Sequence, residues 1–148
     1  MKSLLRKLSV VLVAGAFGGV VNDLVIWLFD AVGLLERTGV AISGSLVKSD
    51  LYMRIIWGGI WGLLFVLPMM KRSVWLRGMV FSLAPTLVQL LIVFPLRAEV
   101  GWFGLDLGGA TPVFVFLFNL AWGIAAAAWV VGARGDRIDD SGLSLDGI

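Results

Sequence analysis

The sequence of 148 residues contains no cysteine and no histidine. These absences exclude disulfides, thiolate nucleophiles, iron–sulfur clusters, cysteine or histidine zinc sites, histidine-ligated haem and histidine-based catalytic triads. Any catalysis would have to use carboxylates or lysine. We therefore expect neither a metal ion nor a cofactor, and we identify no catalytic residue.

Charge is also scarce. Only 15% of the residues are charged, whereas soluble domains carry roughly 25%. Hydrophobic residues make up 59% of the chain, and the mean hydropathy is +0.98. The net charge is only +2, and the basic residues lie at the ends of apolar runs, so nucleic acid is not an expected partner. The composition predicts a membrane protein that contacts the lipid bilayer.

Four apolar runs are long enough to cross a membrane. At 1.5 Å per residue, about 20 helical residues cross a hydrocarbon core of roughly 30 Å. The fold class is therefore all-α: a polytopic membrane protein with one four-helix transmembrane domain over residues 1–133 and a polar tail over 134–148 that we expect to be disordered. The predicted spans are residues 8–30, 51–70, 74–94 and 111–132.

The beginnings of three spans carry helix-capping residues. Asp50 is predicted to cap the second span, Ser73 the third, and Thr111, with a proline after it, the fourth. Residues 34–50 are expected to form a surface loop or an interfacial turn, and residues 95–110 a loop along the membrane surface that begins at a proline. Tryptophan is expected to face lipid or the interface.

The distribution of lysine and arginine predicts the orientation. Four spans place both termini on one side, and assigning that side to the cytoplasm puts most of the positive charge inside. The predicted cytoplasmic set is Lys2, Arg6, Lys7, Lys71, Arg72, Arg77, Arg134 and Arg137, and the predicted outer set is Arg37, Lys48, Arg54 and Arg97.

Small residues form stripes along the predicted spans. In lipid, helices associate where small side chains let their backbones approach closely, because no hydrophobic force drives them together. Gly58 and Gly62 form the small-x-x-x-small pattern of such a contact. The predicted packing residues are Gly15, Gly18, Gly19, Gly58, Gly62, Gly78, Ser82 and Gly123.

Each span also carries a polar side chain in the half of the membrane away from the termini. A charge at such depth is costly and needs a partner. We predict that Asp23 or Asp30 pairs with Arg54, because opposite charges best offset each other's burial cost when they are also hydrogen-bonded. The predicted intramembrane cluster is Asn22, Asp23, Asp30, Arg54, Gln89 and Asn119.

A short motif in the last span resembles lipoprotein signal peptidase. Residues 118–121, Phe-Asn-Leu-Ala, match that family's Phe-Asn-x-Ala-Asp motif. Trp122 stands where the catalytic aspartate of the family would be, and the partner motif of its third span is absent. We therefore reject that activity.

A broader resemblance covers three stretches. The glycine-rich first span, the Gly-Gly-Ile-Trp-Gly stretch at 58–62, and the basic turn leading into RGMVFSLAPTLVQLLIVFP resemble small uncharacterised bacterial inner-membrane proteins associated with acid resistance. The resemblance implies a multi-pass protein of the bacterial inner membrane. It implies no catalytic residue.

Three hypotheses about function follow. The leading one is a non-enzymatic helix bundle that acts by contact, as an accessory or assembly subunit of a membrane-protein complex or as a homo-oligomer, given its many glycine faces. The alternative is proton, ion or small-solute transport through the polar cluster around Asp23. The third is an intramembrane enzyme, which would require Asp23 together with Asp30 or Asp106.

Overall fold

The structure is a computed structural model that describes residues 2–44, 46–70 and 73–134. All regular elements within these residues are helical, which agrees with the predicted all-α class. Except for Arg134, which ends the last helix, the predicted tail lies outside the described residues. The elements are α1 (Lys2–Ala31), α2 (Leu34–Arg37), α3 (Lys48–Gly62), η1 (Leu63–Val66), α4 (Val74–Val88), η2 (Gln89–Ala98), η3 (Trp102–Leu107) and α5 (Thr111–Arg134).

Three helical segments are long and apolar enough to cross a membrane. They are Leu4–Ala31, Val74–Ala98 and Thr111–Ala133, and they contain the predicted first, third and fourth spans. The predicted second span corresponds to α3 followed by the 3₁₀ turn η1, and it ends at Val66 rather than at residue 70. Leu67 is extended, with ψ of 132°, because Pro68 disfavours a helical residue before it.

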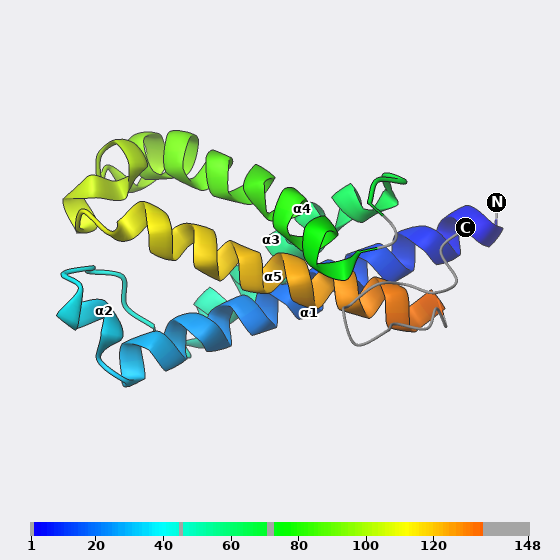
Figure 1. Cartoon of the computed structure of the whole chain (residues 1–148), viewed down its shortest axis with the longest axis horizontal. Coiled ribbons are helices and arrows are strands. Elements are labelled where there is room, and N and C mark those ends of the chain that lie inside the picture. The colour runs from blue at the N-terminus through cyan, green and yellow to red at the C-terminus, as the bar shows by residue number, and fades with distance from the viewer. Residues whose placement is uncertain (1, 45, 71–72, 135–148) are drawn as a thin grey trace.

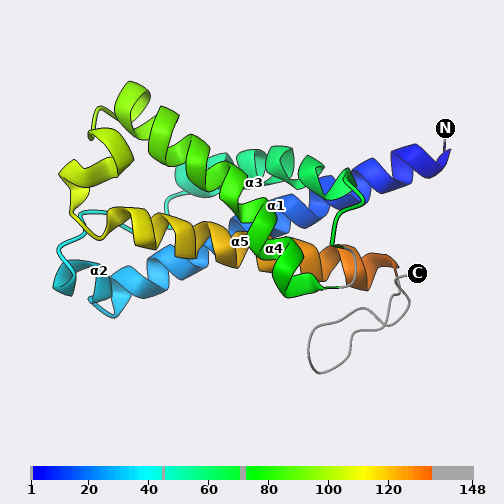
Figure 2. The ribbon, with the colours of Figure 1, turned by 45° about the horizontal axis from the view of Figure 1, so that its top comes forward.

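The long helices run side by side along the molecule (Figure 1). α1 packs against α3 and α5, and α4 packs against α5. α3 and α4 share no comparable interface among the described residues. The start of α1 and the end of α5 lie at one end of the bundle, and α2 and the turn before α5 lie at the other (Figures 1 and 2). At that second end the two connectors meet, since the Ala41 amide donates to the Leu107 carbonyl at 2.7 Å.

The predicted glycine contacts join α1 to α3. A Cβ atom added at Gly15 would lie 2.6 Å from Gly62 Cα, and one added at Gly58 would lie 3.1 Å from Gly19 Cα. Real Cβ atoms essentially never have a neighbour as close as the 2.6 Å found at Gly15, so the backbones of α1 and α3 are in direct contact there. An alanine at Gly15 would force the helices apart.

The other predicted small residues line the contacts of α5. A Cβ atom at Gly78 would lie 2.7 Å from Ile124 Cα, and one at Gly123 would lie 3.2 Å from Ser82 Cβ. Gly18 of α1 faces Trp122 of α5 in the same way, at 2.7 Å. The prediction that these small residues pack helices is confirmed, and all of the contacts form within one chain.

The predicted helix starts are correct in one case and need correction in two. Ser73 Oγ accepts from the Leu76 amide at 3.1 Å, so Ser73 caps α4 as predicted. Asp50 is not a cap, because α3 already begins at Lys48. It lies in the first turn of α3, where its negative charge interacts favourably with the helix dipole. α5 begins at Thr111, but Thr111 Oγ1 is buried with no hydrogen-bond partner among the described residues.

The expected loops are shorter than predicted. Residues 34–50 include the helical turn α2 and the first residues of α3. Pro95 does not end the third span, because residues 89–98 continue as the π-helix η2. A π-helix is wider than an α-helix, and its i→i+5 pattern gives the proline ring room past the preceding turn.

Candidate functional site: a polar cleft between α3 and α4

An ion pair joins α1 to α3 at the centre of the predicted cluster. Arg54 Nε lies 2.7 Å from Asp23 Oδ1, and Arg54 Nη1 donates to Asn22 Oδ1 at 2.8 Å. Asp23 is buried, with 3% of its surface exposed, whereas the Arg54 side chain is 32% exposed. The predicted pairing of Arg54 with an aspartate of the first span is therefore confirmed, and the partner is Asp23.

A second polar pair joins η2 to α5. Asn119 Nδ2 donates to Gln89 Oε1 at 3.4 Å. This distance is beyond the usual range for N–H···O bonds, so the contact is weak and both amides keep capacity for another partner. Asn119 is buried and Gln89 is half-buried.

Asp30 does not belong to the cluster. Its Oδ2 accepts from the Gly44 amide at 2.8 Å and so ties the connector before α3 to the end of α1. Seven residues separate it from Asp23, which is about 10 Å along the helix axis. This separation removes the first aspartate pair that an intramembrane enzyme would need.

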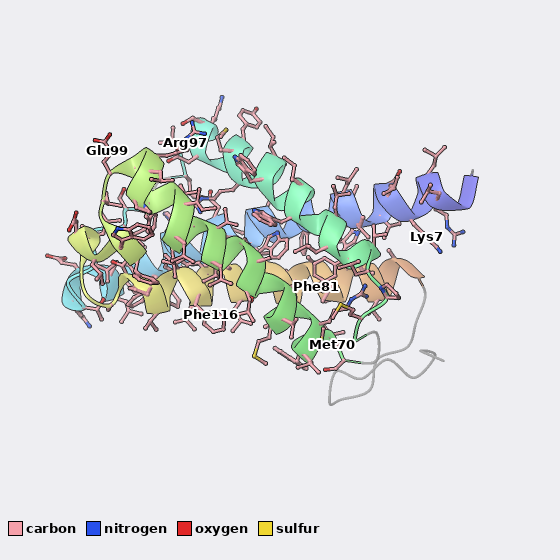
Figure 3. The ribbon with its side chains drawn as sticks, turned by 90° about the horizontal axis from the view of Figure 1, so that it is seen from above. Lys7, Met70, Phe81, Arg97, Glu99 and Phe116 are labelled. Carbon is pink, nitrogen blue, oxygen red and sulfur yellow. The ribbon has the colours of Figure 1, made fainter. Side chains whose placement is uncertain are left out.

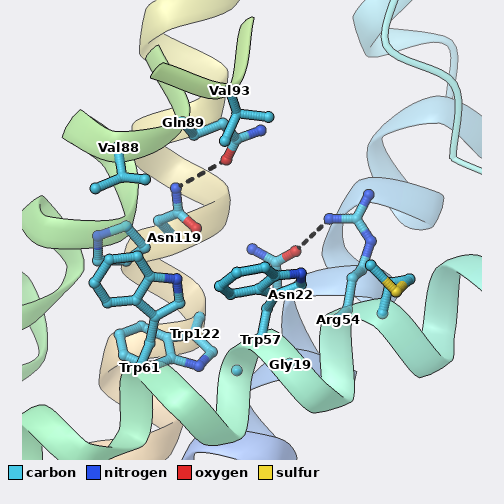
Figure 4. Close-up of a pocket in the computed structure, with 13 residues that line it drawn as sticks. Gly19, Asn22, Arg54, Trp57, Trp61, Val88, Gln89, Val93, Asn119 and Trp122 are labelled. Atoms are coloured by element: carbon cyan, nitrogen blue, oxygen red, sulfur yellow. Dashed lines mark hydrogen bonds between the residues drawn. The ribbon is translucent and has the colours of Figure 1, made fainter. Parts of the chain in front are cut away.

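The Asn22–Arg54 and Asn119–Gln89 hydrogen bonds face one cavity of about 260 Å³ (Figure 4). The α1 and α5 residues form one wall, α3 contributes a second, and α4 with η2 contributes a third. Asp23 is not among the lining residues. The lining consists of Gly19, Asn22, Met53, Arg54, Trp57, Gly58, Trp61, Pro85, Val88, Gln89, Val93, Asn119 and Trp122.

We call this cavity the α3–α4 cleft, because it lies between those two helices, which do not pack against each other as the other helix pairs do. Along α3 it extends from Met53 to Trp61, about 12 Å of a hydrocarbon core that is roughly 30 Å thick. Its wall is mostly apolar, and the positive charge of Arg54, which lines it, is paired with Asp23 outside the lining. The cleft thus offers hydrogen bonds in an apolar setting.

The chain matches no protein-family model, no curated protein and no solved structure.

Tryptophan is the component of the site that sequence reasoning missed. Trp122 is buried, not lipid-facing as expected, and its Nε1 donates to the Gly15 carbonyl at 3.0 Å. Trp57 and Trp61 line the cleft from α3. The sequence contained a pattern that indicates this, because Trp57 and Trp61 follow Arg54 by three and seven residues and so lie on the same face of the helix.

Proposed function

We propose that the protein is a non-catalytic membrane helix bundle that acts by contact, holding a transmembrane segment of a partner in the α3–α4 cleft. The partner is another membrane protein or a second copy of this chain. One observation carries the proposal: the cleft presents hydrogen-bonding side chains sideways, between two helices that do not cover it. In a bilayer such groups need a partner, because lipid tails supply none.

The size of the cleft supports a protein side chain as its occupant. Its volume of about 260 Å³ is below the roughly 300–1,000 Å³ that is usual for small-molecule pockets. Its length covers less than half of the hydrocarbon core. These dimensions fit one or two large side chains of a crossing helix, and they do not form a path across the membrane.

The environment of Asp23 supports contact over transport. Asp23 is paired with Arg54, is buried, and does not line the cleft. A carboxylate that binds and releases a transported proton or ion needs access to it. The ion pair instead ties α1 to α3 and holds Arg54 at the edge of the cleft.

The glycine faces indicate which surface is left for a partner. They were the sequence-based reason to expect oligomers, yet all of the predicted small residues pack inside the chain. The cleft, with its unused amide capacity, is therefore a better candidate surface than any glycine stripe.

The proposal includes α3 with η1 as a fourth crossing. Fifteen α-helical residues and four 3₁₀ residues together extend about 30 Å, the thickness of the hydrocarbon core. Exposed apolar side chains at helical spacing give α3 a lipid-facing stripe outside the cleft; these are Ile56, Ile60 and Leu63. With four crossings, both termini lie on the side that carries more lysine and arginine, which we propose is the cytoplasm of a bacterial cell.

Site-specific photocrosslinking in native membranes tests the proposal. A photoreactive amino acid that replaces Trp57 would face the cleft. The matched control replaces Trp129, which is similarly exposed but does not line the cleft. We expect a crosslinked protein of defined mass from position 57 only, identified by mass spectrometry as a second copy or another membrane protein. Crosslinks to lipid alone from both positions would contradict the proposal.

A liposome assay tests the alternative. If purified protein carried protons down an imposed gradient, and Asp23→Asn abolished this flux, transport would replace contact as the function. We expect no flux above that of empty liposomes.

A further inference from the structure

A second cavity lies at the end of the bundle where α1 begins and α5 ends. Its volume is about 510 Å³. It is separate from the α3–α4 cleft, and no lining residue is shared. Figure 3 shows Lys7 at this end of the molecule, opposite Arg97 and Glu99. We call it the basic pocket, and its lining residues are Arg6, Lys7, Val10, Val66, Leu67, Pro68, Arg77 and Ala133.

The basic pocket is positively charged. Three of its described lining residues are basic, and none of them is acidic. Arg6 and Lys7 are exposed, on the first turns of α1. Adjacent cations at the mouth of a cavity attract anions, and the planar fork of an arginine matches the oxygens of a phosphate.

The wall of the pocket is fixed by Arg77. This side chain is only 2% exposed, and its Nη2 donates to the carbonyls of Phe65, at 2.8 Å, and Leu67, at 3.2 Å. Its guanidinium carbon also lies 5.2 Å from the centre of the Phe65 ring. Arg77 therefore holds the segment after η1 in place, so that the pocket exists before a ligand arrives.

The rest of the lining is apolar. Val10, Val66, Leu67, Pro68 and Ala133 give the pocket a hydrocarbon surface beside its cations. A ligand that satisfies both parts has an anionic head and an apolar body. A free anion would leave the apolar surface uncovered.

The pocket lies at the ends of two segments that are long and apolar enough to cross a membrane. One membrane-crossing segment begins at Leu4, just before Arg6 and Lys7, and another ends at Ala133, which lines the pocket. The ends of spans lie where lipid phosphates lie. We propose that the basic pocket binds the phosphate-bearing head of an anionic phospholipid, with the glycerol and first acyl carbons against its apolar wall.

Native mass spectrometry of the purified protein tests this proposal, with phosphatidylglycerol as the probe and phosphatidylcholine as the zwitterionic control. We expect the protein to retain one phosphatidylglycerol in preference to phosphatidylcholine. The double variant Arg6→Gln/Lys7→Gln should weaken retention roughly 30-fold, since each interfacial cation contributes about a factor of five. Both side chains are exposed, so this variant should fold normally.

Two control variants separate a pocket from diffuse attraction. Lys48→Gln/Arg97→Gln removes the same charge outside the pocket and should leave retention unchanged. Ala133→Leu narrows the pocket without changing charge and should weaken retention. If Ala133→Leu bound as well as the unaltered protein, or if the Lys48 and Arg97 changes weakened binding equally, the pocket would be refuted as a site.

Competition with inorganic phosphate distinguishes the two sources of the anion. If excess phosphate left the lipid bound, the site would recognise the whole lipid head and its apolar neighbour. If excess phosphate displaced all of the lipid, the pocket would bind a free phosphate-like anion and not a lipid. Equal retention of phosphatidylglycerol and phosphatidylcholine would overturn the proposal.

Discussion

Separating the Asp23–Arg54 pair should have unequal effects on stability, depending on which partner is removed. Arg54→Leu leaves a carboxylate that is 3% exposed without its cation. Removing one member of a buried pair costs about 3–5 kcal/mol, because the remaining charge is uncompensated. Asp23→Leu leaves Arg54, which is 32% exposed and keeps its bond to Asn22. Its long stem can also carry the charge toward the surface.

We therefore expect Asp23→Leu to lower the free energy of unfolding by about 2 kcal/mol, less than Arg54→Leu, because the charge that remains is partly exposed. The double variant Asp23→Leu/Arg54→Leu should lie within about 1 kcal/mol of the unaltered protein, since an apolar pair needs no compensation. The ordering from least to most harmful is then the double variant, Asp23→Leu, and Arg54→Leu.

The assay is equilibrium unfolding in mixed micelles with increasing dodecyl sulfate, followed by tryptophan fluorescence. Seven tryptophans are present, and one of them, Trp122 of α5, is buried against α1. Asp30→Leu combined with Arg54→Leu is the matched control, because Asp30 binds Gly44 and not Arg54. If the loss of unfolding free energy in the double variant equalled the sum of the losses in the two single variants, within about 0.5 kcal/mol, the energetic coupling of Asp23 and Arg54 would be refuted.

Three further variants test the packing and the caps, each by the same unfolding measurement. Gly58→Ala places a methyl group 2.5 Å from the Gly15 carbonyl oxygen and 3.1 Å from Gly19 Cα and should cost about 1–3 kcal/mol. Gly132→Ala, which meets no atom of another element within 4 Å, should be near neutral, and equal effects of the two changes would argue against backbone contact. Trp122→Phe removes the bond to the Gly15 carbonyl and should cost about 1 kcal/mol. Ser73→Ala should cost a similar amount by removing the α4 cap, and no change would show that water replaces it.

Features that depend on a single helix were predictable. The apolar runs predicted three of the long helices because each satisfies its own backbone hydrogen bonds and needs about 20 apolar residues to cross lipid. The Ser73 cap was predictable because its bond closes within four residues. The small-residue stripes followed from the helical period, which places Gly58 and Gly62 on one face.

Features that depend on neighbouring elements were predicted less well. The helix predicted over residues 51–70 ends at Val66, before Pro68, whereas Pro95 is accommodated in η2, which packs against η3. Asp30 was expected in the cluster, since it shares a helix face with Asp23, but it lies nearer the helix end and binds Gly44. The helical period predicts the direction in which a side chain points, but it does not predict which group of a neighbouring element that side chain contacts.

The sequence by itself determined the three helices long and apolar enough to cross a membrane, the helical content, and the helix face of most polar and small residues, because composition and period act within one helix. Only the tertiary structure decided that α1 lies between α3 and α5, that α3 and α4 remain apart, and that Asp23 is the partner of Arg54. The physical reason is that four helices with small residues on their faces can be arranged side by side in several orders. The close backbone approach at Gly15, Gly58 and Gly123 selects one order, and that order opens the cleft.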